Sequence, residues 1–314
     1  MSSRVRAVFL GTPAFAVPSL VALCDVAEVV GVVCQPDKPA GRGLELTESP
    51  VKREARARGL EVHQPTKMRD GTFAEWIRAR DVEVAIVVAY GRILPADVLA
   101  APRRGCLNVH ASLLPRHRGA APINWAILSG DDVTGVSLMQ MDEGLDTGPV
   151  LVTRKTPIAI DETAVELYAR LSELGASMVR EELPNFLEGR LVPVPQDHDA
   201  STLAPMLTKD MARIDWKKSA RAVHDQIRGL QPWPGASTTL AARRLIVHRA
   251  SLHDAPTLQA GAPGEVVAVT KDRMWVATTE GAIALTEVQL EGKKRQSVHD
   301  FLVGHPVRPG TMLG

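Results

Sequence analysis

The sequence predicts an α/β fold: a Rossmann-like, doubly wound and mostly parallel sheet, followed by a small β-barrel. Short apolar runs alternate with helical patterns through the first part of the chain, which is typical of a doubly wound sheet. Residues 26–35 (VAEVVGVVCQ) are nearly all apolar, as expected of a parallel strand that is covered on both faces. Toward the end of the chain, short alternating runs separated by glycines indicate a small barrel.

The local patterns place the elements in chain order. In the first part we expect strands over residues 4–10, 26–35, 61–63, 82–90, 106–110, 134–141 and 150–158. We expect helices up to residue 24 and over residues 119–130, 162–188 and 217–229. One further helix begins at Ser49-Pro50, with the serine as N-cap and the proline at the first helical position.

A Pro-rich, aperiodic run, LVPVPQDHDASTLAP, follows the long helix and is a natural linker. We therefore expect an N-terminal domain of residues 1–189, a linker of residues 190–207 and a C-terminal domain of residues 208–314. The first strand turns into GTPAFAV, which lacks the second and third glycines of a dinucleotide fingerprint. This argues against a nicotinamide cofactor.

The composition of the 314-residue chain is ordinary for a globular protein, with 45% hydrophobic and 23% charged residues and a net charge of +1. The charge is unevenly placed, because residues 206–314 carry 15 Lys+Arg against 10 Asp+Glu. This surplus hints at a polyanionic partner. The three cysteines have no CxxC spacing, which predicts reduced thiols. The nine histidines have no spacing typical of metal ligands, so we expect no metal. Without a leader or a membrane-length apolar run, we expect a cytoplasmic protein that does not bind membranes. We also expect a monomer.

The candidate site lies in residues 105–149. Strand alternation puts Asn108 and His110 on one side of their strand and Leu107 and Val109 on the other. If the next strand is a parallel neighbour, its carboxyl end brings Asp146 to the same crevice, where open α/β sheets bind ligands. An amide, an imidazole and a carboxylate together can hold an oxyanion and move a proton, which suggests acyl transfer. Taken singly, each residue also fits a structural role, as a satisfied histidine or a turn residue.

The segments NVHASLLPRHRGAAPINWAI and GVSLMQMDEGLDTGPVL closely resemble the methionyl-tRNA formyltransferases, which use 10-formyltetrahydrofolate as one-carbon donor. AVFLGTPAFAVPSL, QPDKPAGRG, AYGRILP, LTKDMARIDW and IRGLQPWPGA extend the resemblance over nearly the whole chain. His117 departs from the family, which commonly has an aromatic residue there. The resemblance implies a formyltransferase domain followed by an OB-like tRNA-binding domain. It also implies that the chain formylates the amino group of methionyl initiator tRNA, with Asn108, His110 and Asp146 as the catalytic residues.

The resemblance also assigns binding residues. For the folate donor these are Arg92, Ile93, Leu94, Ser112, Leu113, Leu114, Pro115 and Asp142. For the tRNA they are Lys38, Arg42, Lys209, Lys293, Lys294 and Arg295. Lys38 and Arg42 belong to the loop of residues 36–49, which composition alone leaves open as functional or as a surface excursion. Two other functions stay open: a formyl-folate enzyme with another amine acceptor, such as an amino sugar nucleotide or glycinamide ribotide, and a non-catalytic RNA-binding protein.

Overall fold

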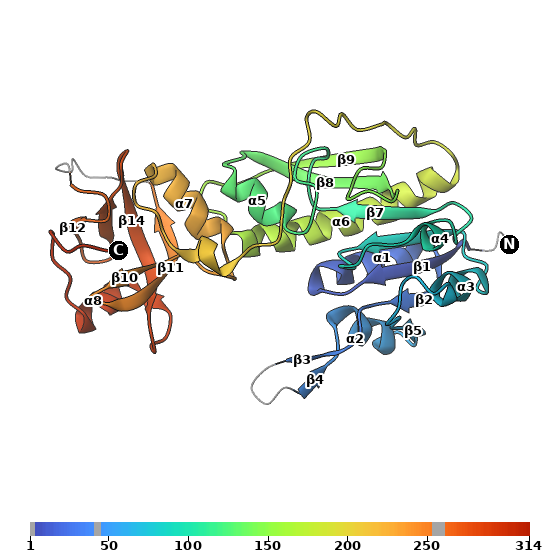
Figure 1. Cartoon of the computed structure of the whole chain (residues 1–314), viewed down its shortest axis with the longest axis horizontal. Helices are drawn as coiled ribbons and strands as arrows, with labels where there is room; N and C mark the ends of the chain where they lie inside the picture. The colour runs from blue at the N-terminus through green and yellow to red at the C-terminus, as the bar shows by residue number, and fades with distance from the viewer. Residues whose placement is uncertain (1–3, 41–44, 253–260) are drawn as a thin grey trace. The chain divides into compact units, whose positions relative to one another are not determined.

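The structure, a computed structural model, describes residues 4–40, 45–252 and 261–314 (Figure 1). The chain forms two compact units, each built from separate stretches of sequence. The first unit consists of Met1–Pro122, Thr134–Thr156 and Tyr168–Ala204. The second unit consists of Ile123–Val133, Pro157–Leu167 and Pro205–Gly314.

A seven-stranded sheet with the order β5-β2-β1-β6-β7-β8-β9 forms the centre of the first unit, and each of its strands was predicted from the sequence. Their bounds are Arg6–Gly11 (β1), Glu28–Val33 (β2), Val62–His63 (β5), Val84–Val88 (β6), Cys106–His110 (β7), Val133–Gln140 (β8) and Val150–Pro157 (β9). The pairs from β5 to β7 are all parallel. The five residues of β6 are all buried, as their apolar character requires of a central parallel strand. The predicted doubly wound sheet is confirmed.

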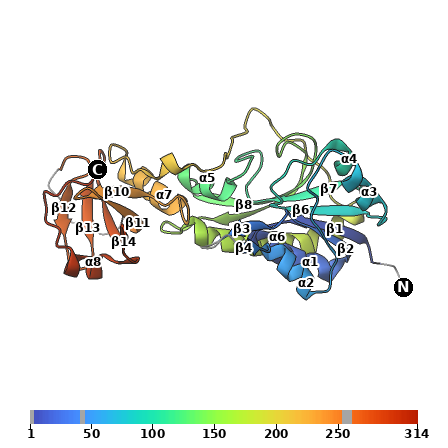
Figure 2. The ribbon, with the colours of Figure 1, turned by 60° about the horizontal axis from the view of Figure 1, so that its bottom comes forward.

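Helices cover both faces of this sheet (Figure 2). One face packs against α3 (Thr72–Arg78) and α4 (Ala96–Leu99), which share an apolar core with β1 and β6. The other face packs against α6 (Ala164–Leu187), where Gly175 lies against Val109 of β7. Next to α6 lies α1 (Val17–Val26), which follows a short 3-10 helix, η1 (Ala14–Ala16). Because Val109 faces α6, the alternating residues Asn108 and His110 must point to the opposite face.

One prediction about this sheet is wrong, because β8 runs antiparallel to β7, with Leu107 opposite Gln140 and His110 opposite Ser137. A strand–helix–strand sequence normally gives a parallel pair, since the helix packs back on the sheet. Here the intervening helix α5 (Pro122–Leu128) belongs, from Ile123 onward, to the second unit. The end of β8 therefore lies beside the beginning of β7.

The loop of residues 36–49 contains a two-stranded antiparallel sheet that the sequence did not predict. Its strands are β3 (Lys38–Ala40) and β4 (Glu45–Thr47), and Arg42 lies outside the described residues. The loop leads into α2 (Pro50–Ala57), whose N-cap is Ser49, as predicted, because the serine side chain accepts a hydrogen bond from the backbone of Lys52.

The second unit is an antiparallel sheet with the strand order β10-β11-β14-β13-β12, in which β15 pairs with β14. Its strands are β10 (Ser237–Leu240), β11 (Arg243–Ser251), β12 (Val266–Val269), β13 (Met274–Ala277), β14 (Ala282–Leu290) and β15 (Gln296–Ser297). Its helices are η2 (Lys209–Ala212), α7 (Ala220–Gly229) and α8 (Val298–Gly304). Apolar residues of α7 and α8 pack against the sheet in one core. The curled antiparallel sheet agrees with the predicted second fold.

Within the described ranges, the structure has no helix that is both long and apolar enough to cross a membrane.

Candidate active site

The structure brings Asn108, His110 and Asp146 together on one face of β7. The side-chain nitrogen Nδ2 of Asn108 donates a hydrogen bond to Asp146 Oδ1 at 3.1 Å. The other carboxylate oxygen, Oδ2, lies 3.6 Å from His110 Nδ1. Asn108 and His110 are 8% and 6% exposed, so these polar groups are largely withdrawn from water. Such burial strengthens their electrostatic interactions.

Asp146 reaches the site by a route that differs from the prediction. Because β8 ends beside Cys106, the chain must return along β7, and residues 141–149 form this returning loop. Gly148 permits a close approach, since a Cβ there would lie 2.0 Å from the carbonyl oxygen of Gln140. Asp146 has a left-handed backbone, with φ of +54°, a conformation that is uncommon for a residue with a side chain. The loop thereby places the carboxylate over the carboxyl end of β7.

The segment after β7 supplies two more groups to the site. The backbone nitrogen of Gly119 donates to Asp146 Oδ2 at 2.9 Å, and the carbonyl oxygen of His117 lies 2.9 Å from His110 Nε2. A carbonyl oxygen only accepts, so His110 Nε2 carries a hydrogen in this contact. The imidazole is therefore fixed in orientation between His117 and Asp146.

The contact with Asp146 alone determines which end of the Asn108 amide faces the carboxylate. The Asp146 carboxylate only accepts, so the nitrogen of the amide must face it. This nitrogen carries two hydrogens, and Asp146 takes one. Among the residues that the structure describes, no acceptor is seen for the second hydrogen. Asn108 therefore has one N–H group near the carboxyl end of β7 that is available to donate to a ligand.

Comparison with known proteins decides the family. Residues 6–183 match the family model described as formyl transferase, and residues 206–306 match the model of the formyl transferase C-terminal domain. The methionyl-tRNA formyltransferase of Sorangium cellulosum is 52% identical over 310 residues, which cover 99% of this chain and 100% of that protein. The methionyl-tRNA formyltransferase of Myxococcus xanthus is 52% identical, covering 98% of both chains. This chain belongs to the methionyl-tRNA formyltransferase family.

Solved structures support the fold at lower identity. An N-formyltransferase from Helicobacter canadensis, in complex with folinic acid and dTDP-3-aminofucose, is 18% identical with a TM-score of 0.67, covering 90% of this chain and 98% of that one. HypX from Aquifex aeolicus, in complex with tetrahydrofolic acid, is 21% identical with a TM-score of 0.62, covering 96% of this chain and 47% of that one.

The residues predicted to bind folate fall into two groups by exposure. Leu94 and Leu114 are 2% and 8% exposed and thus belong to the packed interior, whereas the neighbouring Ile93 is 71% exposed. Leu113 and Pro115 are half-buried, and the peptide bond between Leu114 and Pro115 is cis. Ser112 is fully buried, and its hydroxyl donates to the carbonyl oxygen of Arg116 at 2.6 Å. Its contribution within this structure is therefore to the shape of the loop.

Two polar residues that were predicted to bind folate form hydrogen bonds that hold neighbouring loops. Arg92 Nη1 donates to the carbonyl oxygens of Pro65 and Thr66 at 3.1 and 3.2 Å. Asp142 Oδ1 accepts from Thr147 Oγ1 at 2.6 Å and from the backbone of Gly144 at 3.1 Å, so it closes the loop that carries Asp146.

The residues predicted to bind tRNA differ in how their charges are compensated. Lys38, Lys209, Lys293 and Lys294 are all exposed. Arg295 instead makes a bidentate pair with Glu287, with distances of 2.5 and 2.6 Å. This pairing holds the pKa of Glu287 below its ordinary value and neutralises much of the Arg295 charge. Arg295 is therefore a weaker candidate for a phosphate contact than the two lysines before it.

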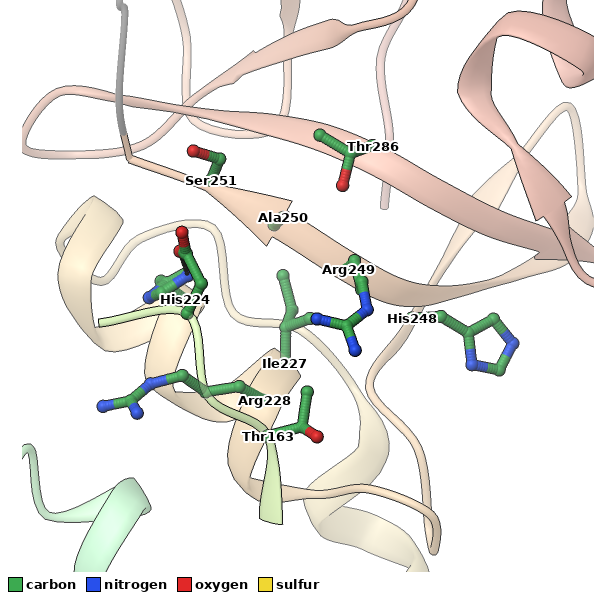
Figure 3. A pocket seen from close by; sticks show the side chains of 10 residues that line it. Thr163, His224, Ile227, Arg228, His248, Arg249, Ala250, Ser251 and Thr286 are labelled. Carbon is green, nitrogen blue, oxygen red and sulfur yellow. Dashed lines mark ion pairs between the residues drawn. The ribbon is translucent and has the colours of Figure 1, made fainter. Parts of the chain in front are cut away.

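The second unit contains a pocket of about 150 Å³ lined by α7, β11, β14 and the loop after β9 (Figure 3). Its charged side chains have partners: Arg228 pairs with Asp225 at 2.8 Å, Arg249 pairs with Glu166 at 2.6 Å, and Asp161 Oδ1 lies 3.0 Å from His224 Nε2. None of its lining residues belongs to the predicted sites. Because these charges are compensated by neighbouring side chains, we assign no substrate to it.

Sequence reasoning missed Gly119 and Gln196. Gly119 lies within the segment NVHASLLPRHRGAAPINWAI and has a φ of +121°. Its role, the N–H that donates to Asp146, becomes visible only in the fold. Gln196 lies in the run assigned to the linker and carries no motif at all, yet its side chain reaches the backbone of Asp146.

Proposed function

We propose that this chain transfers the formyl group of 10-formyltetrahydrofolate to the amino group of methionyl initiator tRNA. Relatives that are 52% identical over the whole chain carry the name of this activity. The observation that carries the assignment of the chemistry is the contact of Asp146 with both Asn108 and His110.

The reaction needs no nucleophile from the protein, because the methionyl amine attacks the formyl carbon itself. Negative charge then develops on the formyl oxygen. In our proposal, the second amide hydrogen of Asn108 donates to this oxygen, as in other sites that stabilise an oxyanion. Collapse of the intermediate breaks the bond to folate N10 and leaves the formamide on the methionine.

A proton must leave the amine and another must reach N10. His110, the last residue of β7, is the candidate for this transfer. Its Nε2 is bonded to the His117 carbonyl, so Nδ1, which lies 3.6 Å from Asp146 Oδ2, is the ring nitrogen that can take up the proton. Asp146 orients the imidazole and stabilises it when positively charged, while Gly119 holds the carboxylate. The sequence and the geometry support these roles jointly.

We further propose that the folate ring binds beside residues 92–94 and 112–115, with Ile93 as the exposed apolar contact. Apolar side chains together with backbone donors and acceptors suit a flat heteroaromatic ligand. The shape of the loops there depends on Asp142, Ser112 and Arg92, which are bonded to backbone or to side chains of the loop.

For the tRNA we propose contacts to Lys38, Lys209, Lys293 and Lys294, which are exposed. Arg42 is also proposed to contact the acceptor stem, with its guanidinium reaching phosphates or base edges. Arg42→Ala should then lower the rate of formylation sharply while leaving folate binding intact. An unchanged rate would contradict a role for this residue.

Mass spectrometry of the charged tRNA tests the proposed reaction. The protein is incubated with 10-formyltetrahydrofolate and methionyl initiator tRNA, and the methionine is expected to gain the mass of one CO. Glycinamide ribotide and an amino sugar nucleotide are offered in parallel as alternative acceptors. Formylation of either of these, with none of the tRNA, would overturn the assignment.

A further inference from the structure

The segment of residues 196–204 lies against the loop that follows β7. Arg118 donates from its backbone to Thr202 at 2.8 Å, and Ala204 donates to the carbonyl oxygen of Arg118 at 2.7 Å. Gly119 fits here because a Cβ would lie 2.9 Å from the carbonyl oxygen of Ala204. This segment therefore fixes the chain that carries two contacts of the site, the His117 carbonyl and the Gly119 N–H.

Within this segment, Gln196 reaches the loop that carries Asp146. Its Nε2 donates to the carbonyl oxygen of Asp146 at 2.9 Å and to that of Gly148 at 2.7 Å. Gln196 is 8% exposed, so these bonds compete little with water. The two carbonyls flank Thr147, and one side-chain amide thus fixes the backbone on both sides of this residue.

Arg118 fixes the orientation of the Gln196 amide. Its Nη2 and Nε lie 2.7 and 3.1 Å from Gln196 Oε1, and Nη1 lies 3.3 Å from His198 Nδ1. A guanidinium only donates, so the amide oxygen of Gln196 must face Arg118 and its nitrogen must face the two carbonyls. Arg118 is 5% exposed, and no carboxylate pairs with it among the described residues. Its charge is instead shared with neutral acceptors, chiefly Gln196.

We propose that Gln196, oriented by Arg118, is a positioning residue for the Asp146 carboxylate. The inference rests on the proposed function, since it assumes that Asp146 acts in formyl transfer. Asp146 has the left-handed φ of +54°, which costs free energy for a residue with a side chain and is maintained by the contacts around it. The hydrogen bond from Gln196 to the Asp146 carbonyl is such a restraint. Without it, the carboxylate is held only by its bonds to Asn108 and Gly119, and its backbone can shift it away from the position that contacts His110. Gln196 itself contacts neither Asn108 nor His110 among the described residues.

The test is Gln196→Glu. Glutamate has nearly the same shape as glutamine and keeps an acceptor oxygen, but it replaces the donating NH2 group with a second oxygen. Glutamate still accepts from Arg118, so the buried charge keeps a partner. It cannot donate, however, and it places a carboxylate oxygen against two carbonyls. We expect kcat for formylation of methionyl initiator tRNA to fall about 10- to 100-fold, because small misplacements of catalytic groups have effects of this size. The KM for each substrate should stay within about twofold of the wild-type value, since ground-state binding does not depend on the restraint.

Gln226→Glu is the matched control. Gln226 Nε2 likewise donates to two backbone carbonyls, those of Met211 and Arg213, both at 2.8 Å, but in the second unit. It should keep the wild-type kcat even if it lowers the melting temperature. A purely structural role for Gln196 predicts that both variants lose stability and neither loses kcat.

Asn108→Ala, measured in the same assay, separates the two hypotheses. If Asn108→Ala is inactive and folded Gln196→Glu has the wild-type kcat, the positioning role is overturned and the proposed site stands. If Asn108→Ala is fully active, the proposed site fails, and the positioning role fails with it. Should Gln196→Glu not fold, the double variant Gln196→Met with Arg118→Met, which removes the donors and the buried charge together, must show the same loss of kcat.

Discussion

Removal of the Asn108 side chain gives the sharpest prediction for the proposed chemistry. In Asn108→Ala the site loses the N–H that donates to Asp146 and the second N–H, which we propose donates to the formyl oxygen. Loss of one oxyanion donor costs about 2.7–4 kcal/mol in acyl-transfer enzymes, so kcat should fall about 10²–10³-fold. The KM for each substrate should change little, because the interaction strengthens only in the transition state.

The same change has a separate effect on stability. Asp146 Oδ1 loses its donor while the carboxylate is only 13% exposed, and an unsatisfied buried acceptor costs about 1–3 kcal/mol of unfolding free energy. Unfolding in denaturant therefore accompanies the kinetic assay. Asn108→Asp serves as a second variant that keeps the volume, removes the donors and should be at least as inactive.

Asn185→Ala is the control for Asn108→Ala. Asn185 Nδ2 also donates to a carboxylate, Glu182 Oε2, at 2.9 Å, but it lies at the end of α6. Its kcat should equal that of the wild type. A folded Asn108→Ala enzyme whose kcat is within about twofold of the wild type would refute the oxyanion role.

Two further predictions concern the second unit. Burial raises the pKa of Glu166, but the Thr163 backbone N–H and Arg249 outweigh it and hold the pKa at about 2. Its stabilising contribution is thus complete above the ordinary value of 4.5 and is lost as the pH falls toward 2, so Glu166→Gln should flatten the acid limb of stability against pH. In tRNA binding, Lys293→Ala should make the slope of log affinity against log salt shallower by about 1. Arg295→Ala should change this slope by less, because Glu287 already neutralises that arginine. Equal changes of slope in the two variants would contradict this.

Much of the site could be predicted from the sequence, because strand alternation alone places Asn108 and His110 on one face. The direction of β8 could not, because it depends on whether the intervening helix packs on the sheet. The residues between β7 and β8 carry an ordinary helical pattern, yet most of that helix belongs to the second unit. Asp146 still reaches the predicted partners because the loop after β8 turns back along β7.

Gln196 shows what local patterns leave out. It lies in an aperiodic run, and its partners Asp146 and Arg118 are 50 and 78 residues away in the sequence. Neither family match includes it, since they cover residues 6–183 and 206–306. Its role follows only from hydrogen bonds that form once the chain has folded. The β3–β4 pair was missed for a related reason: proline and glycine predict a loop, whereas cross-strand pairing decides whether it is ordered.

The most direct measurement of the proposed chemistry is the single-turnover rate of His110→Ala, with excess enzyme and both substrates bound. A proton-transfer role predicts that the rate of formyl transfer falls about 10²–10⁴-fold while the dissociation constants of both substrates remain unchanged. His63→Ala is the control, because His63 stacks on Trp76 at 4.5 Å in the same unit and has no part in the proposed site. A wild-type single-turnover rate in folded His110→Ala would show that formyl transfer does not depend on this histidine and would contradict the proposed site.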